Sequence, residues 1–275
     1  MPEASSQMPA TRCQQSAANF AKKVKQKSYL RPRMTKEVKP DSSLETSKKE
    51  QVEEMFNSIA RRYDFLNRFL SLGIDRGWRK KAISYLKPLA PKLILDVATG
   101  TGDLAIEAMS LKPTKIIGLD IAEQMLVVGR EKIAHKGLAN IIEMVNGDSE
   151  NLPFPDNNFD AITVAFGVRN FQNLSKGLKE MNRVLKPGGR IVVLEFSKPS
   201  TFPFKQGYNF YFTYILPVLG NMLSNSKNAY TYLPESVKHF PEGAEFVAYL
   251  HDAGFKNMIV KPLTFGTCSL YIADK

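Results

Sequence analysis

The sequence predicts an α/β protein built on a mostly parallel sheet that is covered by helices. Three observations predict it. Short apolar runs alternate with helix-like patterns between residues 93 and 196, a glycine-rich turn follows the first of these runs, and two β-like segments close the chain. Strands that alternate with helices are joined by right-handed crossovers, which make neighbouring strands parallel.

The first predicted element is helical and begins at Lys48. Val52, Met55 and Ile59 recur at three- and four-residue spacing, which is the period of one helix face. Tyr63 and Asn67 are four residues apart, so on one helix they share a face. Residues 48–90 are therefore predicted to form a helical lid next to the sheet.

The first apolar run, at 93–97, ends in a glycine-rich turn that contains Gly100 and Gly102. A buried strand that leads through such a turn into a helix is a nucleotide-binding device. Glycine lets the backbone approach the ligand, and the helix N-terminus offers unpaired N–H groups. Dinucleotides and S-adenosylmethionine both use this device, so the turn alone leaves two ligand classes open.

The second predicted strand, at 115–120, ends in Asp120, whose carboxylate can accept hydrogen bonds from ribose hydroxyls in either ligand class. Asp103 directly follows the second glycine of the turn. Its charge would repel a diphosphate, but it could receive the cationic amino-acid end of S-adenosylmethionine. The alternative is that Asp103 only complements the dipole at the start of its helix.

Three more strands are predicted at 141–145, 161–166 and 191–196, the last after a tight turn at 186–189. Asp148 and Ser149 follow the third strand, and an acid at this position can accept the exocyclic amine of an adenine. The Leu-Pro-Phe turn at 152–154 can pack on the adenine ring. The alternative for that turn is a rigid proline loop that closes over the sheet edge.

Two longer stretches carry a family resemblance. Tyr63-Asp-Phe-Leu-Asn67, continuing through Ser71 to Trp78, resembles the first signature of the ubiquinone/menaquinone biosynthesis C-methyltransferases. The stretch 183–199 resembles their second signature along its whole length, and the segment from Phe166 to Asn170 resembles their strand-four segment. With the glycine turn and the acids after it, residues 48–275 resemble a class I S-adenosylmethionine-dependent methyltransferase.

The resemblance implies one Rossmann-like methyltransferase domain over 48–275, with a seven-stranded, mostly parallel sheet, one antiparallel strand and helices on both faces. It implies S-adenosylmethionine as co-substrate and no metal. The residues expected to hold S-adenosylmethionine lie in the glycine turn and at the strand ends: Gly100, Thr101, Gly102, Asp103, Asp120, Asp148 and Ser149.

The same resemblance implies that Tyr63, Asp64 and Asn67 line the acceptor pocket. Arg169 follows the fourth strand, at the edge of the sheet where ligands bind, so its guanidinium can stabilise an oxyanion and Asn170 can orient it. The alternative is that Arg169 pairs with a surface acid. We expect Arg169, Asn170, Tyr63 and Asp64 to be catalytic; the proton acceptor stays open among Tyr63, Asp64, Tyr232 and His239.

Two positions depart from the family pattern. Asp75 stands where the first signature commonly has histidine, so no catalytic role is carried over to this position. Ala165 stands where some relatives have serine near the cofactor, which removes one expected contact.

The expected reaction is the C-methylation of a polyprenylated demethylquinol, with demethylmenaquinol preferred as the last step of menaquinone biosynthesis. The alternatives are a benzoquinol of the ubiquinone pathway, a non-catalytic methyltransferase-like scaffold subunit and a dinucleotide-dependent oxidoreductase. The sequence leaves open the prenyl length and the oligomeric state, although an oligomer is compatible with it.

The net charge of +11 is unevenly distributed. Residues 1–49 hold eleven Lys/Arg against four Asp/Glu, whereas the remainder holds 27 against 23. Residues 1–47 are therefore predicted to be a basic, disordered tail. The tail is interpreted first as inert or as an artefact of gene calling with the true start at Met34, then as a membrane-adhesion segment, then as a targeting segment. No nucleic-acid partner is expected, because no groove-reading motif accompanies the charge.

Seven aromatic residues fall within 202–214, inside a predicted substrate-side insertion at 200–240. The insertion is either a part of the core or an aromatic wall for a flat ring and an apolar tail. No apolar run reaches the length of a transmembrane helix. The two cysteines have no metal-ligand spacing and suggest a reducing compartment. The expected location is cytoplasmic, with peripheral contact to the inner face of the cytoplasmic membrane.

Overall fold

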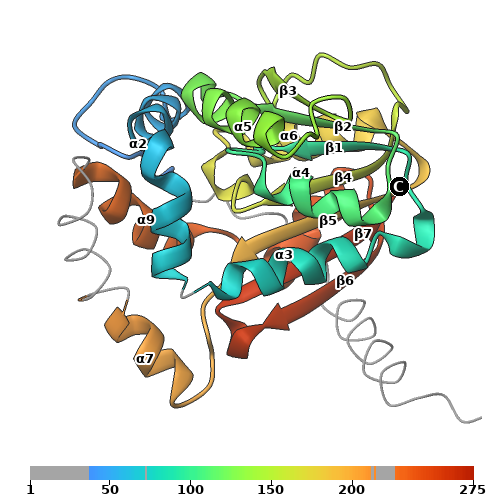
Figure 1. The fold of residues 1–275 in the computed structure, drawn as a ribbon. Coiled ribbons are helices and arrows are strands. Elements are labelled where there is room, and N and C mark those ends of the chain that lie inside the picture. The colour runs from blue at the N-terminus through green and yellow to red at the C-terminus, as the bar shows by residue number, and fades with distance from the viewer. Residues whose placement is uncertain (1–36, 72, 212–213, 215–226) are drawn as a thin grey trace, which may run out of the picture.

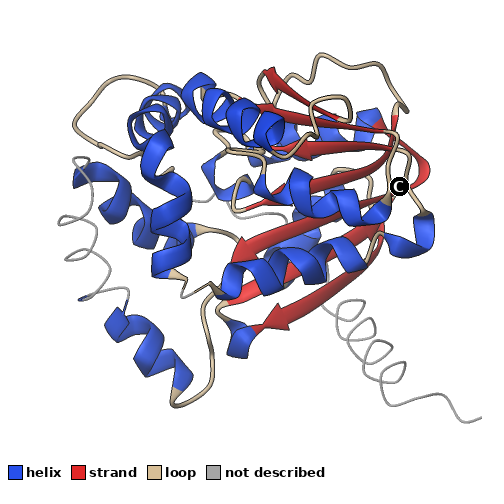
Figure 2. Ribbon diagram, in the orientation of Figure 1, coloured by secondary structure: helices blue, strands red, loops and turns tan. Residues whose placement is uncertain are grey.

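The computed structural model describes residues 37–71, 73–211, 214 and 227–275. Its centre is a seven-stranded sheet in the order β3-β2-β1-β4-β5-β7-β6 (Figures 1 and 2). The strands are β1 (Leu93–Val97), β2 (Lys115–Asp120), β3 (Ile142–Asn146), β4 (Phe159–Ala165), β5 (Leu185–Phe196), β6 (Lys256–Leu263) and β7 (Cys268–Asp274). The five neighbours β3, β2, β1, β4 and β5 pair in parallel, and β7 is antiparallel to both of its neighbours. The predicted sheet is confirmed.

Helices cover both faces of the sheet. The α-helices are α2 (Lys48–Leu70), α3 (Ile74–Ser84), α4 (Asp103–Ala108), α5 (Glu123–His135), α6 (Leu174–Val184), α7 (Phe204–Phe210), α9 (Lys227–His239) and α10 (Ala244–Asp252). Short 3-10 turns are η1 (Lys87–Leu89), η2 (Met109–Leu111), η3 (Val168–Asn170) and η5 (Thr264–Gly266).

The core has one apolar layer on each face of the sheet. On one face, α6 and α10 pack against β1, β4 and β5 through residues such as Leu178, Met181 and Phe246, each fully buried. On the other face, α3, α4 and α5 contribute Ile83, Ala105 and other buried residues. The central strands β1, β4 and β5 are mostly apolar and buried on both sides because both sides are covered, which is the pattern of a doubly wound sheet.

The strand limits differ most from prediction at β5. Residues 186–189 were expected to be a tight turn before the strand, but β5 begins at Leu185 and includes them. Leu185 pairs with Phe159 and Arg190 pairs with Ala161, so the register shifts between the two pairs. Gly188 has a φ of 78°, a conformation that glycine adopts without steric cost. The Pro-Gly-Gly segment is therefore an irregularity inside the strand.

Helix α2 lies at the edge of the sheet toward which β5 points, together with α7 and α9 (Figure 1). The predicted lid at 48–90 thus consists of α2, α3 and η1. The loop before α2 is fastened to it, because Asp41 N donates to Gln51 Oε1 (2.8 Å) and Val38 packs on the apolar face of α2. Residues 1–36 of the predicted tail lie outside the described residues.

Candidate active site

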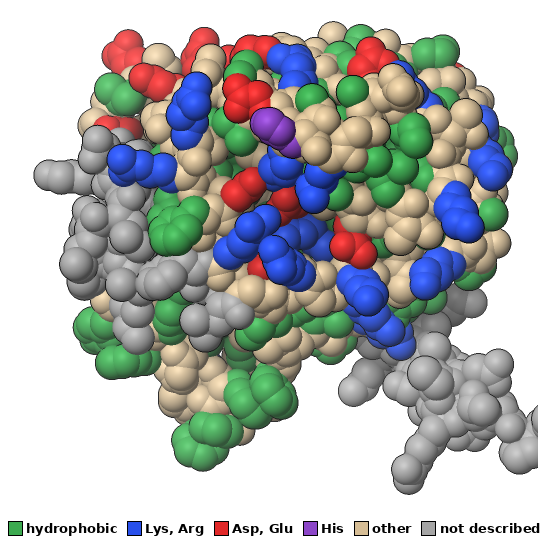
Figure 3. Space-filling model, in the orientation of Figure 1, with side chains coloured by type: hydrophobic (Ala, Val, Ile, Leu, Met, Phe, Trp, Pro, Cys, Tyr) green, Lys and Arg blue, Asp and Glu red, His purple; other side chains and the backbone are tan. Residues whose placement is uncertain are grey.

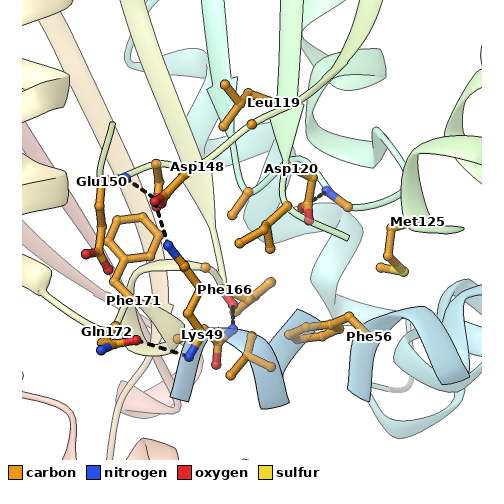
Figure 4. Close-up of a pocket in the computed structure, with 18 of the residues that line it drawn as sticks. Lys49, Phe56, Leu119, Asp120, Met125, Asp148, Glu150, Phe166, Phe171 and Gln172 are labelled. Atoms are coloured by element: carbon orange, nitrogen blue, oxygen red, sulfur yellow. Dashed lines mark hydrogen bonds and ion pairs between the residues drawn. The ribbon is translucent and has the colours of Figure 1, made fainter. Parts of the chain in front are cut away.

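A first cavity of about 80 Å³ lies at the carboxyl ends of β1, β2 and β4, with α2 across it (Figure 4). Four of the residues predicted to hold the cofactor line this cavity: Gly100, Asp120, Asp148 and Ser149. Ala98 and Phe166 also line it, and both have positive φ values, 52° and 57°. Strained backbone of this kind gathers where ligands bind.

Asp120 is fixed by backbone donors. Its Oδ2 accepts from Gly100 N (2.8 Å), and its Oδ1 accepts from Ala122 N (2.9 Å). Burial raises the pKa of Asp120 above its usual value, against the lowering effect of these donors. Each carboxylate oxygen can accept a second hydrogen bond, so Asp120 retains the capacity to accept from hydroxyl groups in the cavity.

Asp148 contributes a second carboxylate and is covered by the first turn of α2. Lys49 Nζ lies 3.0 Å from Asp148 Oδ2, and both side chains are partly exposed (Figure 4). The Leu-Pro-Phe turn does not line this cavity, contrary to the adenine interpretation. Leu152 is buried in the core, and the Phe154 ring packs edge-on against Phe159, with centroids 5.1 Å apart.

The other three predicted cofactor residues belong to the glycine turn or directly follow it, and they line neither cavity. Gly102 is the residue before α4 and has a φ of 80°. Thr101 donates to Asp64 Oδ1 (2.5 Å) and accepts from Lys132 Nζ (2.9 Å). Asp103 lies 2.8 Å from the same Lys132 Nζ.

Asp103 has a second cation in Arg79 of α3, whose Nη2 lies 3.2 Å away. Burial alone would raise the pKa of Asp103, but Lys132 and Arg79 hold that pKa below its usual value. Lys132 also lies 2.5 Å from Asp64 Oδ2. These contacts tie the glycine turn to α2, α3 and α5, and they place Asp64 outside both cavities.

A second cavity of about 540 Å³ adjoins the first. Phe56, Tyr63 and Phe166 line both cavities and therefore form their common wall. The second cavity is mostly apolar, with walls from α2, α3, α7, α9 and η5. Its aromatic lining includes Trp78, Phe196, Phe204, Tyr208, Tyr211, Tyr232 and Phe265. Several of these residues belong to the aromatic insertion that the sequence singled out.

Arg169 lines the second cavity and Asn170 lines the first. Arg169 does pair with an acid, but a fully buried one: its Nη1 lies 2.9 Å from Glu195 Oε1 at the end of β5. Burial raises the pKa of Glu195, and Arg169 opposes that shift. Arg169 Nε is buried and has no hydrogen-bond partner within the described part of the chain. A ligand would reach this donor only after neighbouring side chains move, because the atom has almost no exposed surface.

Tyr232 holds a second buried polar atom without a hydrogen-bond partner in the lining of this cavity. The residue is 3% exposed, and its hydroxyl has no partner among the described residues. Tyr63 lies in the common wall, where burial raises its pKa against the effect of a hydrogen bond with Asn67. His239 lines neither cavity and contacts Glu235 on its own helix, so it is removed from the candidate proton acceptors.

Lys48 is a site residue that sequence reasoning missed. Its ammonium donates to Arg169 O and Phe171 O, each at 2.9 Å, and its side chain is buried. Burial lowers the pKa of Lys48 to about 8. The first turn of α2 thus holds the η3 turn that carries Arg169. In sequence Lys48 was one lysine in a basic segment, and nothing marked it as buried.

The part of the chain that the structure describes contains no group of three His, Cys, Asp or Glu side chains arranged to hold a metal ion. Within the same residues, no helix is both long and apolar enough to cross a membrane.

Comparison with known proteins gives the family. The model of the ubiE/COQ5 methyltransferase family matches residues 44–275, which is most of the chain. The chain belongs to the ubiE/COQ5 methyltransferase family. The family match includes both predicted signatures and all residues of the two cavities.

Relatives within this family are similar over nearly their whole length. The demethylmenaquinone methyltransferase of Bacteroides fragilis is 52% identical over 239 residues, covering 86% of this chain and 97% of the relative. The ubiquinone/menaquinone biosynthesis C-methyltransferase UbiE of Geotalea daltonii is 48% identical, covering 84% and 98%.

Solved structures with low sequence identity share the fold. A SAM-dependent methyltransferase from Thermotoga maritima has a TM-score of 0.58 at 20% identity and covers 81% of this chain and 99% of its own. The [4+2]-cyclase SpnF has a TM-score of 0.51 at 16% identity, covering 82% and 96%. A cyclase among these neighbours shows that the fold alone does not specify the reaction.

Proposed function

We propose that this protein transfers the methyl group of S-adenosylmethionine to a ring carbon of a polyprenylated demethylquinol, converting demethylmenaquinol to menaquinol. One observation carries the proposal: a large aromatic cavity, with two buried polar atoms that lack partners among the described residues, shares a wall with the cavity at the glycine turn. A flat ring with hydroxyl groups and an apolar chain matches such a cavity in size and polarity.

The first cavity fits S-adenosylmethionine in chemistry. Asp120 would accept from the ribose hydroxyls, Gly100 would admit the ligand close to the backbone, and Asp148 with Ser149 would receive the adenine. Thr101, Gly102 and Asp103, also predicted to hold the cofactor, would instead fix the conformation of the glycine turn. Small-molecule sites measure roughly 300–1,000 Å³. A cavity of about 80 Å³ must therefore widen on binding, and we propose that it does so where Lys49 of α2 contacts Asp148 in its lining.

The second cavity would hold the quinol ring. Once neighbouring side chains move to expose them, Arg169 Nε and the Tyr232 hydroxyl would form their unmade hydrogen bonds with the quinol oxygens, since an unpartnered buried polar group costs about 1–3 kcal/mol. The Phe166 and Phe196 rings are stacked, with centroids 4.4 Å apart, and Arg169 lies 5.6 Å from the Phe196 ring centre. They would form a floor beneath the substrate.

This arrangement favours methylation of carbon. When a hydroquinol loses a phenolic proton, electron density moves from the oxygen to the adjacent ring carbon, which then attacks the methyl group. Arg169 would stabilise the negative oxygen as it develops, in a site that excludes water. Asn170, across the wall in the first cavity, donates to Phe166 O (3.4 Å) and would hold the turn that carries Arg169.

Three alternatives remain to be separated. A demethylated benzoquinol of the ubiquinone pathway has the same ring chemistry, and the relatives' names include both pathways. A non-catalytic scaffold would not need a fixed carboxylate such as Asp120 in the first cavity. A dinucleotide-dependent oxidoreductase is tested by ligand binding, because Asp103 is paired with Lys132 and Arg79 and does not by itself oppose a diphosphate.

We also propose that the protein works at the inner face of the cytoplasmic membrane. The mouth of the second cavity is lined by Phe204 and Phe265, whose rings are stacked with centroids 3.8 Å apart. Phe202 and Phe210 are 79% and 58% exposed beside it. Figure 3 shows hydrophobic side chains gathered on the projecting part of the surface around α7. This aromatic rim would enter the interfacial layer of the bilayer and admit the prenyl chain.

The test is methyl transfer from S-adenosylmethionine to reduced short-chain demethylmenaquinone and to a matched demethylated benzoquinol. We expect turnover on the naphthoquinol at a higher kcat/KM and a lower kcat/KM for Tyr232→Phe. NAD should neither bind nor compete. Tight S-adenosylmethionine binding with no turnover on either quinol would contradict the proposed reaction and favour the scaffold alternative.

A further inference from the structure

The second cavity contains few groups that could accept a proton. Its titratable lining residues, among those described, are two arginines, four tyrosines and a single carboxylate, Asp75. Arginine does not lose its proton in proteins, and the burial that raises the pKa values of Tyr63, Tyr208 and Tyr232 keeps those hydroxyls protonated. Asp75 is therefore the one side chain in the described lining that is of a type able to accept a proton at neutral pH.

Asp75 is held rigidly in the first turn of α3. Its Oδ1 accepts from Ser71 Oγ (2.7 Å), and its Oδ2 lies 2.6 Å from Arg79 Nη2. The side chain is 5% exposed, and Oδ2 has almost no exposed surface. A carboxylate oxygen can accept more than one hydrogen bond, so Oδ1 keeps an acceptor position beside its bond from Ser71.

The aromatic floor connects Asp75 with Arg169. Trp78 is three residues after Asp75 on α3 and so lies on the same side of the helix. Its ring centroid is 6.2 Å from that of Phe166 and 6.3 Å from that of Phe196. Arg169 lies over the same Phe196 ring. Asp75 and Arg169 line the same cavity as this floor, so a ring resting on it would share the cavity with one carboxylate and one guanidinium.

We propose that Asp75 is the proton acceptor for the quinol, the group that removes the phenolic proton as the methyl group is transferred. This inference rests on the proposed function. It gives a catalytic role to the position at which the sequence departs from the family signature.

The step balances as follows. The phenolic O–H bond breaks and its proton passes to an Asp75 oxygen, while the O–H electron pair moves into the ring. The ring carbon forms a bond to the methyl carbon, the methyl–sulfur bond breaks, and its electron pair stays on sulfur. The ring C–H proton then passes to the oxygen and restores the aromatic ring. The proton on Asp75 leaves to solvent.

An aspartate is a weak base toward a phenol, since about six pKa units separate the two free groups. Full ionisation before methyl transfer is therefore unfavourable, and the proton must move while Arg169 stabilises the developing oxyanion. Rigid placement by Ser71 and Arg79 favours such a concerted transfer, because no reorganisation is needed.

A structural role would give a different outcome. Asp75 also orients Arg79, which contacts Asp103 at the start of α4. Asp75 has Arg79 on its own helix as its nearest charged group. Further charges are Asp103 on α4, with Arg68 of α2 near it, and the Arg169–Glu195 pair beside β5. If Asp75 only held Arg79, its replacement would weaken folding or cofactor binding without changing the pH dependence of the chemical step.

The experiment compares Asp75→Asn and Asp75→His with the wild type, and uses Asp252→Asn, at an exposed position at the end of α10, as the matched control. We expect Asp75→Asn to lower kcat about 10²–10⁴-fold, with S-adenosylmethionine affinity unchanged. Asp75→His, which restores the residue of the signature, should recover part of kcat. Its activity should fall below about pH 6.5, where the wild type remains active, because a histidine must be neutral to accept a proton.

A second substrate keeps the test independent of folding. A fluorinated demethylquinol is more acidic and needs less help to ionise, so the defect of Asp75→Asn should shrink on it by tenfold or more. If the wild type turns over, three results would overturn the inference about Asp75 but not the proposed function. They are an undiminished kcat in Asp75→Asn, an unshifted pH profile in Asp75→His, and an equal defect of Asp75→Asn on both quinols. Absence of wild-type turnover on any quinol would overturn the proposed function as well.

Discussion

The positions of Asp120 and Asp103 show how far the place of a single site residue could be predicted from the sequence. Both were expected to contact the cofactor from their place after a strand or a glycine. Asp120 lines the first cavity, because the end of β2 fixes its position relative to the glycine turn. Asp103 faces Lys132 and Arg79, which come from helices 29 and 24 residues away, and spacing along the chain does not reveal such partners. Its role in cofactor binding stays a prediction.

Replacing Asp120 tests the first cavity. In Asp120→Ala the ribose loses a charged acceptor, and hydrogen bonds to charged groups are worth about 1.5–3 kcal/mol each. We expect affinity for S-adenosylmethionine to fall about 10–100-fold by titration calorimetry. Asp252→Asn should bind as the wild type does. Unchanged affinity in Asp120→Ala would show that the nucleoside does not lie against β2.

Arg169 and Glu195 have to be tested as a pair. Arg169→Met leaves a buried carboxylate unpaired, which costs about 3–5 kcal/mol, so loss of activity in this variant alone would be ambiguous. The double variant Arg169→Met/Glu195→Gln should recover most of the free energy of unfolding but not kcat. Denaturant unfolding and turnover measured on the same samples separate the two effects. Recovery of kcat in the double variant would refute a role for Arg169 in the reaction.

The raised pKa of Asp96 predicts that the free energy of unfolding depends on pH. It is buried beneath the glycine turn and accepts from Thr99 and Thr163, and burial raises its pKa to about 6. Since its unfolded value is about 3.9, the folded protein binds the proton more tightly, and this stabilisation is complete below about pH 4 and lost as the pH rises through 6. Relative to Asp96→Asn, the wild type should gain up to about 3 kcal/mol on acidification from pH 7 to 4. A pH-independent difference in unfolding free energy would contradict this.

At the scale of elements, α2 does more than its pattern revealed. Periodicity predicted the helix and the shared face of Tyr63 and Asn67, and the structure confirms both. The two lysines of its first turn contact the η3 turn and Asp148, more than 95 residues further along the chain. Long-range contacts of this kind depend on how a helix crosses a sheet, which no local pattern specifies.

A substitution of Lys49 tests whether the contact of α2 with Asp148 restricts access to the first cavity. A half-exposed ion pair is worth about 0–1 kcal/mol, so Lys49→Gln should accelerate S-adenosylmethionine association by no more than about fivefold in stopped-flow fluorescence. Lys49→Arg, which keeps the charge, should associate at the wild-type rate. Slower association in Lys49→Gln would mean that Lys49 helps to recruit the ligand.

At the scale of the whole molecule, the sheet order was predictable because alternating apolar runs and helices leave few topologies for a parallel sheet. The sequence could not show that two cavities share the wall formed by Phe56, Tyr63 and Phe166. That wall joins α2 to the end of β4, and it appears only once the lid is placed on the sheet.

The aromatic rim formed by Phe202, Phe204, Phe210 and Phe265 should bind membranes, and its loss should not change methyl transfer to a short-chain quinol. In Phe202→Ser/Phe210→Ser we expect binding to anionic phospholipid vesicles to weaken at least about tenfold, because each buried phenylalanine contributes about 1.5–3 kcal/mol. Turnover on a short-chain quinol should be unchanged, since neither residue lines the cavity. Ile259→Ser on the edge strand β6 is the control. Equal vesicle binding by the double variant would place the docking surface elsewhere.

The central claim is that the common wall separates a methyl donor from a quinol ring carbon. The most direct test is to determine where the methyl group is found after reaction of labelled S-adenosylmethionine with reduced short-chain demethylmenaquinone. We predict a product with the labelled methyl on the ring carbon, identified by NMR and mass spectrometry as the menaquinol. A methyl group on oxygen, or no labelled product from protein that binds both ligands, would contradict the claim.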